Sequence, residues 1–513
     1  MTVPGEAERT VRLNQADDVV VALADLVPGP LHLADGTALT LPAGVPRGHK
    51  LAIRAVGQGA AVHKYGQVIG YASVPIAPGD HVHSHNLEYR PVDAQVAVGS
   101  RRSPIAYVPE ADRATFLGYR RANGRVGTRN YLGIVSSVNC SATVAKLVAS
   151  RAEALVAQLP GVDGVVALTH TGGCGTAGRG HEGFDTLQRT LRGYAEHPNF
   201  AGLLVIGLGC EVNQVVSLAG DWEVADGVPV HLMTIQDLGG TRRTVEEAVR
   251  RIEEMLPVAA QARREPVPCS ELVLAMECGG SDGYSGITAN PALGAAADLV
   301  VQQGGTAIFG ETPEIYGAEH LLLERAVSDE VGQRLVERIR WWQRHVEQDG
   351  SSLENNPSPG NKAGGLTTIL EKSLGAIAKG GTTQLCDVVR YGERPSTRGL
   401  VYMDTPGYDP VNATGLVAGG ATVLCFTTGR GSVFGSRPTP CLKLATNTEL
   451  YQRMTEDMDI NCGVIADGES TVPEVGQRIF DLILQTASGR RTLSEELGFG
   501  LEEFVPWQLG ATL

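Results

Sequence analysis

The chain has 513 residues, 42% of them hydrophobic and 64 of them glycine, which is enough for about three globular domains with several buried cores. Its formal net charge of −14 and the lack of a basic block argue against nucleic acid or an anionic membrane surface as the main partner. No run approaches the ~18 consecutive apolar residues of a membrane helix, and residues 1–10 lack a signal pattern, so we expect a cytoplasmic protein.

Residues 1–90 predict a small all-β module. Short runs rich in Val, Ala and Leu lie between closely spaced turn signals such as Asp35-Gly36. Residues 91–112 then carry several prolines and arginines, a composition typical of an extended linker.

The most informative motif of this module is the alternating run of His81, His83 and His85. In an extended segment, side chains at i, i+2 and i+4 share one face, so the three imidazoles are expected to converge on a single divalent ion. Iron, manganese and zinc all accept imidazole ligands. The alternative interpretation of the run is a solvated polar edge strand.

Candidates for proton transfer stand shortly before the histidine run. His63, Lys64 and Tyr65 are consecutive, and all three side chains are able to move protons. His170, which precedes a glycine-rich turn, is a fourth candidate. The alternative for each is a structural, hydrogen-bonded side chain.

Residues 113–258 predict a second, α/β domain. Apolar runs at 132–138, 164–168 and 202–207 each precede a helix-like segment, and a further helix is expected over 242–256. This alternation is typical of a doubly wound parallel sheet. Residues 268–513 continue in the same way and predict a second α/β unit, the C-terminal domain.

Nine cysteines are scattered singly along the chain, which does not suggest a disulfide framework. Four of them, Cys140, Cys174, Cys210 and Cys278, follow predicted strands. The carboxyl ends of parallel strands line the crevice in which such sheets bind ligands, so these thiols are candidate metal ligands. A small buried apolar side chain is the alternative for each one.

Several glycine-rich turns also follow predicted strands, and exposed backbone N–H groups in such turns bind carboxylate or phosphate. Lys362 and Arg430 lie within two of these turns and are candidates for holding a substrate carboxylate. Exposed loop cations are the alternative. Nucleotide binding is weakly supported, because no turn fits a phosphate-loop or dinucleotide-binding pattern. A catalytic serine nucleophile is disfavoured, because no Gly-x-Ser-x-Gly motif with matched partner residues stands out in the sequence.

Three longer segments, 207–211, 277–291 and 356–365, resemble the signature segments of the altronate/galactarate dehydratase family. The resemblance extends from Gly48 to the C-terminus. It implies a β-clip, SAF-like module followed by two α/β regions, an iron-dependent dehydration of sugar acids to 2-keto-3-deoxy acids, and cysteine at the four positions named above. Residues 79–86 resemble the altronate branch, whereas His63 and the loop after Cys174 depart from it.

The resemblance and the motifs together predict a metal-dependent hydro-lyase acting on a sugar acid, with D-altronate as the first candidate. The expected metal is Fe²⁺, with Mn²⁺ or an iron–sulfur cluster as alternatives, and the oligomeric state stays open. Galactarate, another aldonate or aldarate, a sulfolactate-type carbon–sulfur lyase and a non-catalytic binding protein remain as alternatives. The expected substrate-binding residues are Ser281, Asp282, Asn361, Lys362 and Arg430.

Overall fold

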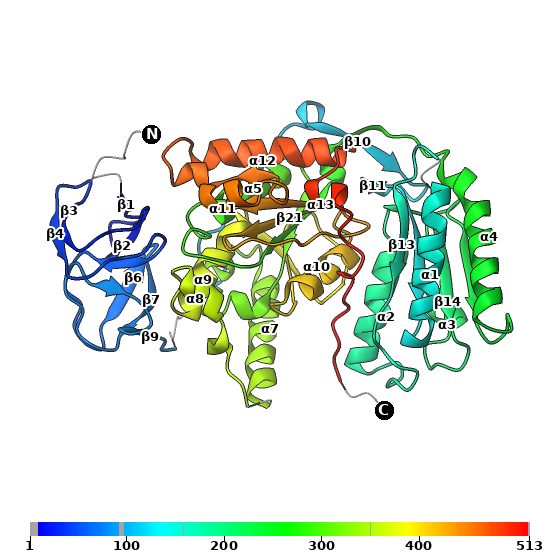
Figure 1. Ribbon diagram of the computed structural model, residues 1–513, viewed down its shortest axis with the longest axis horizontal. Coiled ribbons are helices and arrows are strands. Elements are labelled where there is room, and N and C mark those ends of the chain that lie inside the picture. The colour runs from blue at the N-terminus through cyan, green and yellow to red at the C-terminus, as the bar shows by residue number, and fades with distance from the viewer. Residues whose placement is uncertain (1–8, 92–96, 157–158, 349, 511–513) are drawn as a thin grey trace.

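The computed structural model describes residues 9–91, 97–156, 159–348 and 350–510. Three globular parts lie in a row, with the C-terminal domain between the N-terminal module and the second domain (Figure 1). Small antiparallel sheets form the first part and parallel sheets with helices form the other two, which confirms the predicted fold class. Residues 92–96 of the predicted linker 91–112 lie outside the described residues. Among the described helices, none combines the length and hydropathy needed to cross a bilayer.

The N-terminal module consists of short antiparallel strands joined by tight turns, as expected for apolar runs separated by glycine and proline. One sheet has the order β1-β2-β5-β8, another the order β6-β7-β9, and β3 and β4 form a hairpin. The strands are β1 (Thr10–Val11), β2 (Val19–Ala22), β3 (Gly29–His32), β4 (Ala38–Leu41), β5 (Lys50–Ala52), β6 (Ala61–Lys64), β7 (Gln67–Ala72), β8 (His81–Val82) and β9 (Leu87–Glu88).

The second domain is a parallel sheet of order β13-β12-β14-β15. Helices α1 and α4 pack on one face and α2 and α3 on the other, which is why every residue of β12 and β14 is buried. Helix α4 continues through Pro257, which the sequence predicted as a boundary. The elements are β12 (Tyr131–Ser136), α1 (Asn139–Val156), β13 (Gly164–Leu168), α2 (Glu182–Ala195), β14 (Phe200–Gly207), α3 (Val215–Ala219), β15 (Val230–Thr234) and α4 (Thr241–Ala259).

A small antiparallel sheet carries the chain into and out of the second domain. Its strands are β10 (Thr115–Arg120), β11 (Val126–Gly127) and β16 (Glu265–Pro268), and β10 is paired with both of the others. Buried polar contacts fix the second domain to the C-terminal domain. His197 Nε2 donates to Ala421 O (2.9 Å), and Arg129 forms a bidentate pair with Glu495 (2.6 and 2.8 Å).

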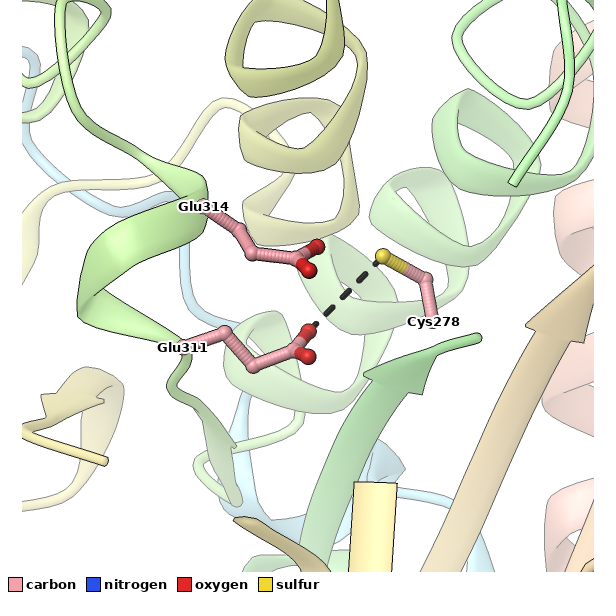
Figure 2. A group of neighbouring side chains, drawn as sticks. All are labelled: Cys278, Glu311 and Glu314. Carbon is pink, nitrogen blue, oxygen red and sulfur yellow. Dashed lines mark hydrogen bonds between the residues drawn. The ribbon is translucent and has the colours of Figure 1, made fainter. Parts of the chain in front are cut away.

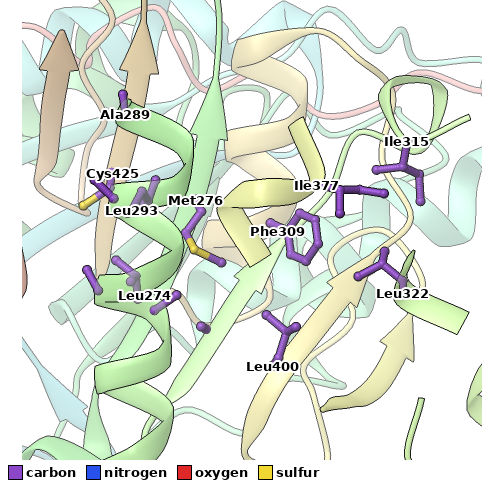
Figure 3. Close-up of a cluster of buried hydrophobic side chains, with 14 of the residues drawn as sticks. Leu274, Met276, Ala289, Leu293, Phe309, Ile315, Leu322, Ile377, Leu400 and Cys425 are labelled. Atoms are coloured by element: carbon purple, nitrogen blue, oxygen red, sulfur yellow. The ribbon is translucent and has the colours of Figure 1, made fainter. Parts of the chain in front are cut away.

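The C-terminal domain is built on a seven-stranded, fully parallel sheet of order β19-β20-β18-β17-β21-β22-β23. Its strands are β17 (Val273–Cys278), β18 (Thr306–Phe309), β19 (Leu385–Val389), β20 (Gly399–Met403), β21 (Val423–Thr428), β22 (Cys441–Ala445) and β23 (Ile460–Asn461). Leu274 and Met276 of β17, Phe309 of β18 and Leu293 of α5 pack together in its core (Figure 3). Burying each such side chain contributes roughly 1.5–3 kcal/mol.

Helices cover both faces of this sheet (Figure 1). They are α5 (Ala289–Gln302), α6 (His320–Leu323), α7 (Asp329–Gln348), α8 (Pro359–Ala363), α9 (Ile369–Ile377), α10 (Asp409–Ala418), α11 (Thr448–Arg453), α12 (Val472–Ala487) and α13 (Leu493–Glu496). The 3₁₀ turns are η2 (Glu110–Asp112), η3 (Cys269–Glu271), η4 (Thr312–Glu314), η5 (Leu353–Asn355), η6 (Ala378–Gly380) and η7 (Gly463–Ile465).

A buried ion triad fixes the N-terminal module to the C-terminal domain. Glu371 of α9 accepts from Lys50 Nζ and from Lys64 Nζ, both at 2.9 Å, and all three side chains are buried. Burial alone would raise the pKa of Glu371, but the two ammonium groups hold it well below its usual range. The carboxylate is therefore charged at neutral pH and is the shared counter-ion of two buried lysines.

We expect the substitution Glu371→Gln to destabilise this contact strongly, because it leaves two buried ammonium groups without a counter-ion, at a cost of about 3–5 kcal/mol. Calorimetric unfolding measures the effect as a lower transition temperature. The control is Glu393→Gln, which breaks the more exposed pair with Arg390 and should shift the transition little. Equal shifts in the two variants would contradict this interpretation of the triad.

Candidate functional site

The three predicted metal-binding histidines do not share one face of a strand. Strand β8 ends at Val82, and residues 83–86 form a turn in which Asn86 Oδ1 accepts from His83 N (2.9 Å). Asn86 thus interrupts the extended geometry on which the prediction rested. The rings nevertheless gather, because His81 lies 5.5 Å, centroid to centroid, from both His83 and His85.

A fourth histidine, His49, joins this group and helps to fasten it to the C-terminal domain. His49 Nδ1 lies 3.0 Å from His81 Nε2, His49 Nε2 donates to Ala363 O (3.3 Å), and His83 Nε2 donates to Lys362 O (2.9 Å). Burial, followed by the neighbouring imidazoles, lowers the pKa of His81 to about 3. Neutral imidazole is the form that binds metals, but several of these nitrogens are engaged in hydrogen bonds.

The described residues include two groups of three His, Cys, Asp or Glu side chains whose ligand atoms lie within 4.8 Å of one another, and neither group contains these histidines. A metal ion shared by His81, His83 and His85 would therefore require the rings to move closer together, and His81 and His83 to leave the hydrogen bonds named above. The histidine site stays a prediction.

The five predicted substrate-binding residues do come together, at the carboxyl edge of β17 and β21. Asn361 Nδ2 donates to Ser281 O (2.8 Å), and Arg430 N donates to Gly280 O (3.0 Å). Ser281, Asp282 and Asn361 are buried and hold the loops in place, whereas Lys362 is half-buried and Arg430 is exposed.

A small cationic cavity of about 120 Å³ opens beside these loops. Arg430 and Arg453 of the C-terminal domain and Arg47 of the N-terminal module contribute three guanidinium groups to its lining. Asn447, Asp282 and Glu449 line it as well, and Glu449 forms an ion pair with Arg47 (3.6 Å). Guanidinium groups bind carboxylates in bidentate fashion. The junction of these two parts of the chain is thus suited to holding a small carboxylate.

A second cluster lies at the same edge of the sheet, and the sequence interpretation missed most of it. Cys278 ends β17, Glu311 follows β18, and Glu314 ends η4 (Figure 2). The Cys278 thiol donates to Glu311 Oε2 (3.8 Å). Glu277 and Asp409 extend the cluster, since their carboxylates form a further three-membered group with Glu311.

Two buried lysines contact this cluster. Lys379 Nζ donates to Cys278 Sγ (2.9 Å) and to Glu311 Oε2 (3.0 Å), and Lys372 Nζ donates to Glu314 Oε1 (2.7 Å). Glu311 itself has φ of 72°, a strained conformation for a residue other than glycine, and its N–H is bonded to Thr405 Oγ1 (2.6 Å). Strain of this kind is concentrated at functional sites.

The charges of the cluster are only partly compensated. Its four carboxyl groups face two ammonium groups, and one oxygen on each of Glu277, Glu311 and Glu314 is buried without a hydrogen-bond partner. Burial and the neighbouring carboxylates raise the pKa of Glu277 well above its usual range. Without a cation, protonation of Glu277 relieves part of the excess negative charge; a divalent cation would take over that role, and carboxylate and thiolate ligands suit Fe²⁺ or Mn²⁺. These residues fit a metal ion.

Comparison with known proteins agrees with this layout. Three family profiles match in order: the altronate/galactarate dehydratase SAF domain at residues 8–90, the D-galactarate dehydratase/altronate hydrolase second domain at 118–260, and the D-galactarate/altronate dehydratase C-terminal region at 269–512. Altronate dehydratase of Escherichia coli is 37% identical over 98% of this chain and 99% of its own length. The chain belongs to the altronate/galactarate dehydratase family.

Two further relatives have different names. Galactarate dehydratase (L-threo-forming) of Escherichia coli is 40% identical, covering 95% of this chain and 94% of its own length. The (2R)-sulfolactate sulfo-lyase subunit beta of Chromohalobacter salexigens is 35% identical, covering 76% of this chain and 96% of its own length. Family membership is therefore shown, whereas these identities leave the substrate open.

Within this family member, the four predicted proton-transfer residues lie in two places. His63, Lys64 and Tyr65 belong to the SAF domain, whereas His170 follows β13 of the second domain, and the C-terminal domain lies between these two parts (Figure 1). His63 Nδ1 is bonded to Asp18 (2.7 Å) and Lys64 to Glu371. Burial works against the charge on Lys64, but Glu371 and Tyr65 outweigh it and raise the pKa of Lys64, so the lysine keeps its proton. A general-base role for these residues stays a prediction.

The four predicted cysteine ligands do not converge either. Cys140, Cys174 and Cys210 are exposed in the second domain, whereas Cys278 is buried in the C-terminal domain against Lys379. Cys278 follows a strand of a different sheet from the other three thiols, and a metal-binding role for the four cysteines stays a prediction. One sequence signal could have revealed the carboxylate cluster, namely Glu311 and Glu314 directly after the apolar run 307–310.

We expect Glu311→Gln to weaken divalent metal binding by at least about tenfold, because the amide removes a negative charge and a ligand shared by both carboxylate groups. Metal content after anaerobic loading with Fe²⁺ or Mn²⁺ provides the measurement. Glu319→Gln, at a half-buried carboxyl outside the cluster, is the control and should bind metal as the unmodified chain does.

The histidine alternative is tested in the same series. Full metal retention by His83→Ala and His85→Ala, together with loss in Glu311→Gln, would assign the metal to the carboxylate cluster. The reverse pattern would contradict that assignment and support the histidines.

Proposed function

We propose that this chain is a metal-dependent hydro-lyase that removes water from a sugar acid, D-altronate in the first instance, and yields a 2-keto-3-deoxy sugar acid. The observation that carries the proposal is the buried carboxylate–thiol cluster, in which three carboxyl oxygens lack hydrogen-bond partners, together with the cavity that Arg47, Arg430 and Arg453 help to line. Membership in the altronate/galactarate dehydratase family supports it.

Dehydration of an aldonate has two demanding steps, the removal of a weakly acidic proton beside the carboxylate and the departure of hydroxide from the next carbon. When bound, a divalent ion at Cys278, Glu311 and Glu314 would supply Lewis-acid stabilisation of the negative charge that develops in both steps. We place Fe²⁺ there, with Mn²⁺ as the alternative.

The residues of the chain would divide the remaining tasks. Arg430, with Lys362 nearby, binds and orients the substrate carboxylate. Asp409 begins α10 and is half-buried, whereas Glu277, Glu311 and Glu314 are buried, so Asp409 is the cluster carboxylate placed to exchange a proton with a substrate. Lys379 keeps a positive charge next to Glu311 and Cys278.

The loop after β17 connects the two parts of the proposed site. Gly279 packs against the carboxylate of Asp409 and the side chain of Phe426. Gly280 lies next to the side chains of Thr428 and Arg430. A side chain at position 279 would collide with Asp409. Only residues 279–281 of the backbone separate Cys278 of the carboxylate cluster from Asp282 of the cavity lining. A small sugar acid must contact both places at once, so the two must lie close together.

Substrate identity rests on two opposing observations. The run 79–86 resembles the altronate branch of the family, whereas the galactarate dehydratase relative has the higher identity, 40% against 37%. We commit to altronate and treat galactarate, other aldonates or aldarates, and sulfolactate as alternatives. A cytoplasmic setting belongs to the proposal as well, and all nine cysteines are free thiols.

We expect 2-keto acid to form from D-altronate after anaerobic loading with Fe²⁺, measured as the semicarbazone. A panel of galactarate, other aldonates and aldarates, and sulfolactate runs in parallel, with sulfite measured separately. Sulfite release from sulfolactate without dehydration of any sugar acid would replace the proposal with a carbon–sulfur lyase. Tight binding without any keto product would indicate a binding protein.

We expect Arg430→Gln to raise KM with a smaller effect on kcat, since the guanidinium binds the carboxylate in both the ground state and the transition state. Loss of a charged hydrogen bond of about 1.5–3 kcal/mol corresponds to roughly 10- to 150-fold in KM. Arg430→Lys should recover part of the loss, and Arg390→Gln, in a surface ion pair, should change neither constant. An unchanged KM in Arg430→Gln would remove this residue from the substrate site.

A further inference from the structure

Three adjacent strands of the second domain are each followed by an exposed cysteine. The sheet order β13-β12-β14 places these strands side by side, and Cys174, Cys140 and Cys210 follow them in that order. They are the three exposed cysteines of the chain, since the other six are buried or half-buried. Neighbouring strands lie about 4.8 Å apart, so parallel strands bring these three loops to one edge.

Hydrogen bonds between the loops hold the cysteine positions together. Asn139 N donates to Gly172 O (2.9 Å) and links the first loop to the second. Val212 N donates to Cys174 O (3.1 Å) and links the third loop to the second. Asn213 Nδ2 donates to Ser137 O (2.9 Å) and closes the ring from the third loop to the first. Every one of these bonds lies within three residues of a cysteine.

The turn that carries Cys210 is rigid for an additional reason. The buried Glu211 carboxylate accepts from Gly209 N (2.7 Å), Leu208 N (3.1 Å) and Ser137 Oγ (2.6 Å). Gly209 has φ of 125°, and a Cβ there would collide with Gln236. The cysteine edge is thus preorganised rather than a loose surface loop.

Three thiols at one rigid edge point to a soft metal centre, because thiolates select zinc, copper(I) or iron–sulfur clusters. A single ion would bring its ligand atoms within a few ångströms of one another. Among the described residues, the groups whose ligand atoms all lie within 4.8 Å do not include these thiols. A cubane [4Fe–4S] cluster instead occupies the space between its protein ligands, so the cysteine sulfurs lie farther apart than the ligand atoms of a single ion do. Cys140 also stands in the first turn of α1, where the helix dipole favours an anionic group.

We propose that Cys140, Cys174 and Cys210 bind a [4Fe–4S] cluster through three of its irons, leaving the fourth iron without a protein thiolate. The loop that leads to Cys174 lines a cavity of about 640 Å³, together with Trp341 and Trp507 of the C-terminal domain. The three cysteines do not line this cavity themselves, but all three are exposed, so their thiols are accessible for cluster insertion. This cluster is separate from the Fe²⁺ ion proposed at Cys278.

The test uses the full-length chain purified anaerobically, or reconstituted anaerobically with iron and sulfide. After the iron bound at the carboxylate cluster is subtracted, we expect about four iron atoms and about four acid-labile sulfides per chain. We also expect the Mössbauer spectrum of a [4Fe–4S] cluster. Cys140→Ser, Cys174→Ser and Cys210→Ser should each lose most of the sulfide and the cluster spectrum. Cys386→Ser and Cys278→Ser are matched controls and should retain both.

Iron without sulfide, one zinc ion per chain, or no uptake on reconstitution would overturn the proposal. Full sulfide retention by any of the three second-domain variants, with circular dichroism showing an intact fold, would overturn it too. The outcome is independent of the proposed dehydration, because sulfide and the Mössbauer spectrum are measured without substrate. A clustered protein that forms no keto acid would refute only the proposed function, and an active protein without sulfide would refute only the cluster.

Discussion

Incomplete charge compensation at the carboxyl edge of β17 and β18 is the constraint on which the proposed chemistry depends. Four carboxyl groups are gathered where two lysines are available to neutralise them, and three carboxylate oxygens remain without partners. Buried charges are tolerated only when they are paired, protonated or bound to a metal. Glu311 completes this group in a left-handed backbone conformation, which costs free energy for a residue other than glycine. Because the fold maintains this cost, a functional role for the group is favoured.

The SAF domain is attached by a buried charge arrangement of the opposite kind, in which one carboxylate, Glu371, serves two lysines. The same contact region brings Arg47 to the cavity that Arg430 and Arg453 line. It also holds His49 and His83 by hydrogen bonds to the loop that contains Lys362. The SAF domain therefore helps to build the cationic side of the proposed site. A variant that loosens Glu371 should for this reason affect substrate binding as well as stability.

Periodic patterns predicted most of the architecture, because strand–helix alternation is a local property of the sequence. The site was harder to predict, because its geometry depends on contacts across the fold. The histidine run looked like one face of a strand, but Asn86 folds it into a turn. Lys64 looked like a free base until Glu371, 307 residues away, appeared as its partner. The carboxylate cluster combines single glutamates from separate loops, and only the preceding apolar strand marked Glu311 and Glu314.

The two proposed metal centres follow one architectural rule applied to two sheets. In each α/β domain the carboxyl ends of adjacent parallel strands carry the metal-type ligands, thiols in the second domain and mainly carboxylates in the C-terminal domain. Ligand chemistry separates their tasks, since thiolates stabilise iron–sulfur clusters and carboxylates hold hard or borderline ions. Cys278 belongs to the carboxylate centre because Lys379 and Glu311 contact it directly. Topology thus divides the four cysteines that a sequence pattern groups together into three proposed cluster ligands and one member of the proposed dehydration site.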